Sequence, residues 1–209
     1  MGEKVLLLQS KGEVDIGVIH TFVRGIEGAM GNDLIDIVPA YDSIAIFTDR
    51  PLNWVAARLT SLSDSSSAVT LKEESVELPI CYELGLDWDE LISHCGLSKE
   101  DIIDIHLAGS YRSLFMGFTP GFIYADGLDV RLSCPRKENP RTSIEAGSVG
   151  IGGTQTGIYS LGSPGGWNII GRTPIELFDI NDNPPTRIEV GSRFSFRRIS
   201  SKEFEEWES

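Results

Sequence analysis

The chain has 209 residues, and 41% of them are hydrophobic, which is enough for a packed core. Its formal net charge of −13 predicts a surface that repels nucleic-acid phosphates and anionic lipid, which excludes nucleic acid and membrane as expected partners. No apolar run approaches the roughly 20 residues that cross a bilayer. The three cysteines, without a CxxC spacing, are typical of free thiols, so we expect a cytoplasmic protein.

The first part of the chain predicts a small domain that mixes helices and strands. Its apolar runs and helical repeats indicate, in order, a strand at Val5–Leu8, a helix over 18–26, strands at Ile35–Val38 and Ile44–Thr48, and a helix over 55–62. A strand at Val76–Ile80 would complete the split β-α-β pattern. The composition changes near this point, and we therefore predict one domain over 1–74 and a second over 75–209.

The second domain is expected to begin with two short helices and to continue as a β-barrel. Asp87 and Gly96 bracket the first helix, and Ser98 with Asp101 resembles a capping box for the second, which runs to about His106. Beyond residue 109, short segments rich in β-formers are separated by glycine and proline. That spacing favours an all-β barrel or sandwich, so the predicted fold class is α+β.

Charge divides along the same line. Residues 1–110 hold 7 Lys and Arg against 19 Asp and Glu, whereas residues 111–201 hold 10 against 8. Nine of those ten cations are arginines, whose planar fork suits carboxylate and phosphate. An anionic small molecule would therefore be received better by the second domain.

Several familiar kinds of site are absent from the sequence. There is no GxxxxGK[ST] phosphate loop, and Gln155 stands where a dinucleotide fingerprint needs its third glycine. Ser148 is placed like a nucleophile elbow, but the three histidines, His20, His94 and His106, all precede it. These histidines lie far apart on expected helices, which favours packed or surface roles over a metal site. We predict no metal and assign no catalytic residue.

The segment from Gly153 to Thr173, GTQTGIYSLGSPGGWNIIGRT, indicates a ligand cleft. Its glycines would let a ligand approach the backbone, and Gly165 with Gly166 could present N–H groups to an anion. Trp167 and Tyr159 would supply apolar walls, and Arg172 a forked cation that anchors a carboxylate or phosphate. The alternative is that the glycines form barrel corners and that Arg172 binds barrel carbonyl groups.

Four segments, GFTPGFIY, PRKENPRTSIEAGSVGIGGTQTGIY, SPGGWNIIGRTPIELFD and NPPTRIEVGSRFSF, closely resemble the KipI/PxpB family, also called the 5-oxoprolinase B subunit or allophanate hydrolase subunit 1. The N-terminal IDIVPAYDSIAIFTD matches as well. The resemblance implies a small α/β domain followed by a cyclophilin-like β-barrel. It also implies that the protein and a KipA/PxpC-type subunit together resemble one carboxyltransferase-type module of urea carboxylases. The predicted cleft comprises Pro120, Phe122, Arg136, Arg141, Gly147, Ser148, Gln155, Thr156, Gly157, Tyr159, Gly165, Gly166, Trp167, Arg172 and Thr173.

The resemblance also implies partners and a cofactor. Family members act with a KipA/PxpC-type subunit and a PxpA-type (LamB/YcsF) protein as an ATP-dependent 5-oxoprolinase, which converts pyroglutamate to glutamate. ATP, with Mg, would belong to the assembled complex, and the isolated chain would be inactive. Two alternatives stay open: a KipI-like inhibitor that binds a sensor histidine kinase, and a subunit of an allophanate or urea carboxylase-type enzyme. Homo-oligomers are also open.

Overall fold

The computed structural model of the chain describes residues 5–12, 14, 16–63 and 75–208. The chain forms two compact units, Met1–Leu71 and Lys72–Ser209. The domain boundary predicted between residues 74 and 75 adjoins the segment outside the described residues, and it stays a prediction.

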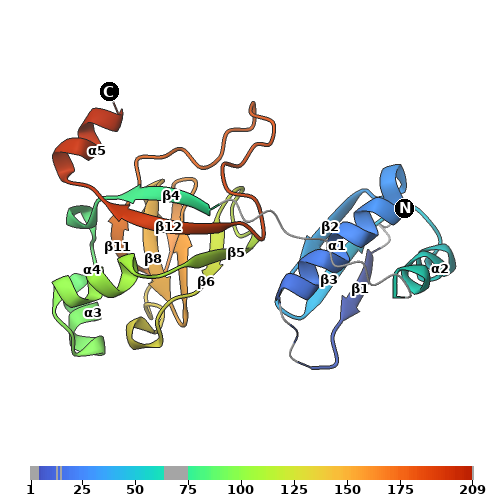
Figure 1. The fold of residues 1–209 in the computed structure, drawn as a ribbon, viewed down its shortest axis with the longest axis horizontal. Helices are drawn as coiled ribbons and strands as arrows, with labels where there is room; N and C mark the ends of the chain where they lie inside the picture. Colours follow the sequence, from blue (N-terminus) through green and yellow to red (C-terminus); the bar gives the residue numbers. More distant parts are fainter. Residues whose placement is uncertain (1–4, 13, 15, 64–74, 209) are drawn as a thin grey trace. The chain divides into compact units, whose positions relative to one another are not determined.

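The N-terminal unit contains a three-stranded antiparallel sheet and two α-helices (Figure 1). Its elements in chain order are β1 (Val5–Gln9), α1 (Ile16–Met30), the 3-10 helix η1 (Gly31–Asp33), β2 (Asp36–Pro39), β3 (Ser43–Phe47) and α2 (Leu52–Ser63).

Helical spacing and strand alternation together produce the core of this unit. Helix α1 buries Ile19, Val23 and Ile26, which recur every three or four residues and so share one face. They form a cluster with the buried residues Ile44 and Ile46 of β3. Strand β3 lies between β1 and β2 and pairs antiparallel with both. The helices and strands predicted from residue 5 to residue 62 are therefore confirmed.

The last strand of the predicted β-α-β-β-α-β pattern belongs elsewhere. Strand β4 (Ser75–Ile80) is the edge strand of a seven-stranded sheet in the C-terminal unit, where it runs parallel to β12 (Arg193–Arg198). Its Leu78 and Ile80 pack in the same cluster as Phe194 and Phe196 of β12. Strand propensity located β4 correctly, but it carries no information about which sheet a strand joins.

The C-terminal unit is built on that seven-stranded sheet, with a two-stranded sheet beside it. Its remaining elements are η2 (Tyr82–Leu84), α3 (Trp88–Cys95), α4 (Lys99–Leu107), β5 (Tyr111–Met116), β6 (Ile123–Asp126), η3 (Val130–Leu132), β7 (Arg141–Ile144), β8 (Ser148–Gly152), β9 (Gln155–Ile158), β10 (Ser163–Gly165), β11 (Asn168–Arg172) and α5 (Ser201–Glu208).

The large sheet curls until its two end strands meet. The strand order is β11-β8-β9-β6-β5-β12-β4, so β11 and β4 are the ends. Cys81, which directly follows β4, exchanges two backbone hydrogen bonds with Arg172 of β11, with N···O distances of 2.8 and 3.0 Å. The curled sheet, with α3 and α4 at one end of it, is visible in Figure 1. The predicted α+β class with a barrel-like second domain is confirmed.

The two faces of the curled sheet carry different apolar clusters. Val149, Ile151 and Ile158 point into the main core, which also holds the buried residues of α3 and α4. Ile169 of β11 belongs to a second cluster with Phe122 and Trp167, whereas its neighbour Ile170 belongs to the main core. This division follows from the alternation of side chains along each strand.

The two short helices end where the sequence predicted, although the Asp87 side chain makes no cap hydrogen bond to α3. Gly96 ends α3 in the left-handed conformation at φ 67°. Ser98 begins α4 with a capping box, in which its hydroxyl accepts the Asp101 N–H at 3.1 Å and its own N–H donates to the Asp101 carboxylate at 3.3 Å.

Limited proteolysis tests the domain boundary. We expect a stable C-terminal fragment that begins between Thr70 and Ser75, because a later cut would remove residues of β4 from its pairing with β12. Mass spectrometry of the fragments identifies the cut. Uniform digestion of the chain, without such a fragment, would contradict the boundary.

Candidate functional site

A buried carboxylate organises one end of the predicted cleft. The Asp87 side chain is only 2% exposed, and it accepts two hydrogen bonds from the Arg141 guanidinium at 2.9 and 2.5 Å. Lys137 donates to it at 2.8 Å and the backbone N–H of Ile169 at 2.7 Å. Burial alone would raise the pKa of Asp87, but these donors hold it below its ordinary value. The carboxylate therefore stays charged and ties four separate segments together.

This arrangement engages Arg141 within the chain, and its place in a ligand cleft stays a prediction. The cleft hypothesis included Arg141 among its lining residues, and in the structure the Arg141 fork binds Asp87, 54 residues away in the sequence. Lys137 is likewise engaged, because it bonds Glu90 as well as Asp87. The sequence identified Asp87 only as a helix start, since its partners are distant along the chain.

Trp167 explains many of the glycines. A Cβ atom at Gly152 would lie 2.7 Å from the indole ring, and one at Gly157 would lie 2.9 Å from it. A Cβ at Gly150 would lie 3.0 Å from the Trp167 Cβ. These distances are shorter than van der Waals contact allows, so the absence of side chains on β8 and β9 makes a flat surface for the tryptophan. Here the glycines accommodate a side chain of the protein itself.

The predicted aromatic walls come together as a packed cluster. The ring of Phe122 lies edge-on to Tyr159, with centroids 4.8 Å apart, and to Trp167 at 5.7 Å. All three are at most 4% exposed. Burial raises the pKa of Tyr159 to about 12, so its phenol stays protonated. Their participation in ligand binding stays a prediction, because in this structure they contact one another.

Arg136 is the predicted cleft cation with an exposed side chain. Its guanidinium carbon lies 5.2 Å from the centroid of the Trp167 ring, in a cation–π arrangement. It also lines a groove of 710 Å³ together with Cys134, Asn168, His94 and Glu90. The groove mixes acidic and basic side chains. Among the predicted residues, Arg136 is the one best placed to meet a ligand or a partner.

Arg172 is held by its own neighbourhood. Its Nε donates to the backbone carbonyl of Ala146 at 2.8 Å, and its Nη1 to the Glu145 carboxylate at 2.6 Å. Its guanidinium carbon also lies 5.4 Å from the Phe204 ring of α5. These contacts favour the structural alternative stated for Arg172 over the anchor role, which stays untested.

Three further predicted residues stand beside Arg172. Gly147 has φ 81°, and a Cβ there would overlap the carbonyl oxygen of Thr173. The N–H of Thr173 donates back to the Gly147 carbonyl at 2.9 Å. Ser148 is buried on β8, opposite Arg172 in the strand register. Gly147 therefore permits a close crossing of two backbones.

Other predicted residues are dispersed. Gln155 and Thr156 point to opposite faces of β9, because side chains alternate along a strand, so they do not form one polar pair. Thr156 is fully buried and donates to the Gly150 carbonyl at 3.2 Å. Gly165 is part of β10, and the carbonyl of Gly166 accepts the Lys137 N–H. Pro120 lies in the turn between β5 and β6.

The sequence did not indicate that His106 lies at the centre of a buried group of polar side chains. The Nδ1 atom of His106 lies 2.7 Å from the Tyr82 hydroxyl, and its Nε2 atom 3.4 Å from the Thr156 hydroxyl. Burial lowers the pKa of His106 to about 3, so the imidazole is neutral near pH 7. The packed role expected for this histidine is consistent with its position inside the barrel.

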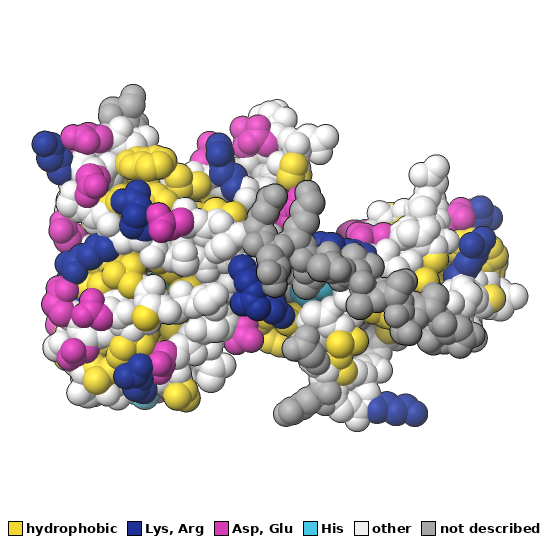
Figure 2. All heavy atoms as spheres, viewed as in Figure 1, with side chains coloured by type: hydrophobic (Ala, Val, Ile, Leu, Met, Phe, Trp, Pro, Cys, Tyr) yellow, Lys and Arg dark blue, Asp and Glu magenta, His cyan; other side chains and the backbone are white. Residues whose placement is uncertain are grey.

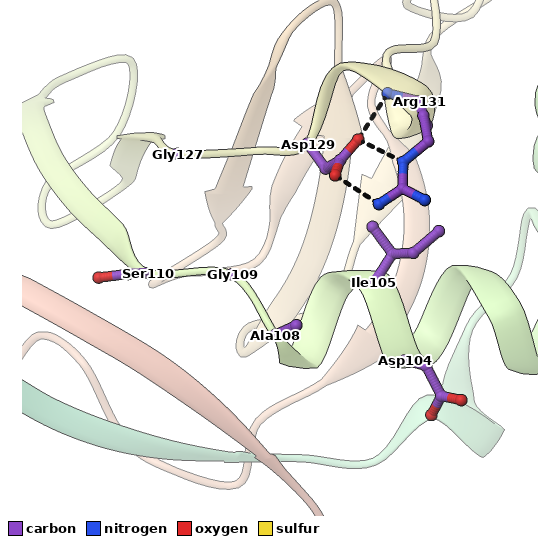
Figure 3. A pocket seen from close by; sticks show the side chains of 8 residues that line it. All are labelled: Asp104, Ile105, Ala108, Gly109, Ser110, Gly127, Asp129 and Arg131. Atoms are coloured by element: carbon purple, nitrogen blue, oxygen red, sulfur yellow. Dashed lines mark hydrogen bonds and ion pairs between the residues drawn. The ribbon is translucent and has the colours of Figure 1, made fainter.

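A second groove, of 480 Å³, contains none of the predicted site residues (Figure 3). In it, Arg131 pairs with Asp129 of its own turn at 2.7 Å, and Ile105 of α4 points toward the arginine. This pair holds the pKa of Asp129 down to about 2. The positive charge of Arg131 in this groove is therefore neutralised by Asp129.

Surface and composition features add limits on the kind of site. On the face shown in Figure 2, acidic and basic side chains are interspersed over the C-terminal unit. In the part of the chain that the structure describes, no group of three or more His, Cys, Asp and Glu residues could hold a metal ion. Within that same part, no helix is long and apolar enough to cross a membrane. All three cysteines are free, and Cys81 and Cys134 are buried.

Comparison with known proteins identifies the class of protein that has this fold and site. The chain belongs to the family described as "Carboxyltransferase domain, subdomain C and D", whose model matches residues 1–188. Within that class, it is 35% identical to the 5-oxoprolinase B subunit of Bacillus subtilis, over 98% of this chain and 93% of that protein. The predicted KipI/PxpB membership is confirmed, and the relatives' name indicates a component of a multi-subunit hydrolase.

More distant relatives carry the same unit within longer chains. A putative urea carboxylase of Emericella nidulans is 27% identical over 79% of this chain and 16% of that protein. The crystal structure of TTHA0988 superposes with a TM-score of 0.83 at 31% identity over 96% of this chain. The chain spans only 41% of TTHA0988, so in that relative the shared unit is joined to further protein.

The Asp87 network predicts a large and specific loss of stability. We expect Asp87→Ala to lower the free energy of unfolding by about 3–5 kcal/mol, because it leaves Arg141 and Lys137 without their buried acceptor. Urea unfolding measures the change. Asp89→Ala, at an exposed acid on the same helix, is the control and should cost less than about 1 kcal/mol. Equal losses in the two variants would contradict the role of the network.

The Trp167 surface predicts intolerance of a single methyl group. Gly152→Ala should lower the free energy of unfolding by about 1–3 kcal/mol and shift the tryptophan fluorescence, because the new Cβ would overlap the indole ring. Gly162→Ala is the matched control, since its Cβ would have 3.7 Å to the nearest atom. An unchanged spectrum and stability in Gly152→Ala would show that the ring is not seated on these glycines.

Proposed function

We propose that this chain is the PxpB-type component of an ATP-dependent 5-oxoprolinase that opens the lactam of pyroglutamate to give glutamate. The proposal rests on one observation, the 35% identity to a 5-oxoprolinase B subunit across nearly the full length of both chains. Its expected partners are a KipA/PxpC-type subunit and a PxpA-type protein, and ATP with Mg would bind in the assembled enzyme.

The geometry supports a site that is completed by another protein of the complex. Two of the predicted cations are engaged within the chain, Arg141 by Asp87 and Arg172 by Glu145. Arg136 remains exposed on top of Trp167. The His106 imidazole, neutral and fully buried, has no route to a substrate on the surface. This chain would therefore contribute a shaped surface and a guanidinium, while a partner supplies the remaining groups.

Reconstitution tests the proposal. The chain should be co-expressed with the KipA/PxpC-type and PxpA-type proteins, and pyroglutamate-dependent ATP hydrolysis and glutamate release measured together. We expect both activities with all three proteins present and neither with the chain alone. Omitting each protein in turn serves as the control. Robust glutamate release by the isolated chain, or ATP hydrolysis at the same rate with and without pyroglutamate, would contradict the proposal.

A second candidate is a component of an allophanate or urea carboxylase-type enzyme. The 27% identity to a putative urea carboxylase favours it as a distant relation. Urea and allophanate offered to the same reconstituted proteins would distinguish it, because that enzyme would respond to them and not to pyroglutamate. The remaining alternative, inhibition of a histidine kinase, rests on the family resemblance.

A further inference from the structure

Three polar side chains around the Trp167 ring have no hydrogen-bond partner among the described residues. The side-chain nitrogen of Gln155 is buried, and no described residue accepts its N–H groups. The Tyr124 hydroxyl and the Arg136 guanidinium likewise make no hydrogen bond or ion pair to a described residue. A buried donor without an acceptor weakens the fold, so its presence needs a physical reason, such as a ligand that accepts from it.

The strand register places Gln155 beside the indole. Ile158 of β9 packs in the main core, so Gln155, three residues before it, points to the opposite face of the sheet. Gln155 pairs with Gly152 across β8 and β9. Gly152 is the glycine whose Cβ would lie 2.7 Å from the Trp167 ring, so the Gln155 side chain leaves the sheet next to that ring.

Tyr124 and Arg136 border the same indole. The Tyr124 ring centroid lies 5.8 Å from that of Trp167, and the Arg136 guanidinium carbon lies 5.2 Å from it. Burial raises the pKa of Tyr124 and the charge of Arg136 opposes that rise, so the two polar groups are within electrostatic reach of each other. Arg136 is exposed, and Tyr124 and Gln155 are partly exposed. We call Tyr124, Arg136, Gln155 and Trp167 the indole site.

The charges at the indole site define the ligand that it suits. All three free groups can donate hydrogen bonds, and the Arg136 fork matches a carboxylate. At the other end, Ala125 of β6 pairs with Thr156, so the next residues, Asp126 and Gln155, are neighbours across the strands. Asp126 is exposed and accepts the N–H of the glycine that follows it at 2.7 Å. Its negative charge would repel a second anion, so the group that accepts from Gln155 should be neutral.

We propose that the indole site binds a small ligand that carries one carboxylate and, at its other end, one neutral amide carbonyl. The carboxylate would accept from Arg136 and the amide carbonyl from Gln155, while the apolar part of the ligand would contact the Tyr124 ring. The proposal goes beyond the proposed function, because it concerns binding by this chain alone and requires no turnover.

Three probes of matched length test the ligand class. Succinamate carries one carboxylate and one amide, succinate carries two carboxylates, and succinamide carries none. We expect the full chain to bind succinamate about tenfold or more tightly than either of the others, because succinamide lacks the anion for Arg136 and succinate places a second anion near Asp126. Isothermal titration calorimetry near pH 7 measures the three Kd values.

Two variants test the residues. Arg136→Gln should raise the Kd for succinamate about tenfold or more, because it removes the charged fork. Gln155→Leu should also raise the Kd, while its melting temperature stays the same or rises, because a buried donor without an acceptor has been removed. Arg58→Gln is the matched control. It removes another exposed arginine, 5.0 Å from the ring of Trp54 in the N-terminal unit, and should leave the Kd unchanged.

Several results would overturn the proposal. One is the absence of succinamate binding, and another is binding of succinate or succinamide as tight as that of succinamate. Equal Kd values for the unmodified chain and Arg136→Gln would place the ligand elsewhere. A lower melting temperature of Gln155→Leu with an unchanged Kd would assign the amide to the fold. The KipA/PxpC-type protein takes part in none of these measurements, so reconstitution of the enzyme can fail while the indole site is confirmed, and the reverse.

Discussion

The C-terminal unit depends on a buried negative charge, the Asp87 carboxylate, which is neutralised by cations and hydrogen-bond donors. Asp87 is nearly inaccessible, and a carboxylate in that position would be costly without the four hydrogen bonds it accepts. The donors come from the start of β7, the loop before it and strand β11, so the network fixes where α3 begins relative to the sheet.

The positively charged side chains of the candidate site therefore differ in their surroundings. Some bond other residues of the chain, and one is exposed. Arg141 and Lys137 stabilise the fold, and Arg172 secures the crossing near Gly147. Arg136 remains on the outside of the indole ring, where it lines a groove. Among the predicted cations, the Arg136 guanidinium is therefore the one that is exposed at the surface.

Local patterns in the sequence were sufficient to predict the helices and strands. They were insufficient to predict which strands pair and which distant side chains bind one another. The Gly96 end of α3, the capping box of α4 and the apolar spacing of α1 depend on residues within one or two turns, and they were predicted correctly. The sheet that β4 joins, and the partner that Arg141 binds, depend on residues far along the chain. The glycines near Trp167 show the same limit. A series of glycines predicts room beside the backbone, but it does not indicate whether a ligand or a side chain of the protein occupies that room. The predicted aromatic residues Phe122, Tyr159 and Trp167 lie together, and Trp167 itself occupies the room beside the glycines.

Strand order in the curled sheet also governs when this unit can fold during synthesis. β12 follows all the other strands of the sheet in the sequence, yet it lies between β5 and β4 and provides the parallel partner for β4. Until residue 198 has left the ribosome, β4 has no neighbour in the sheet, and its apolar residues must wait while β5 to β11 are made. The nascent chain therefore carries an unpaired apolar strand through most of the synthesis of its second unit, and such a strand is prone to wrong pairing and aggregation. A premature stop before β12 would leave β4 and β5 without the strand that joins them.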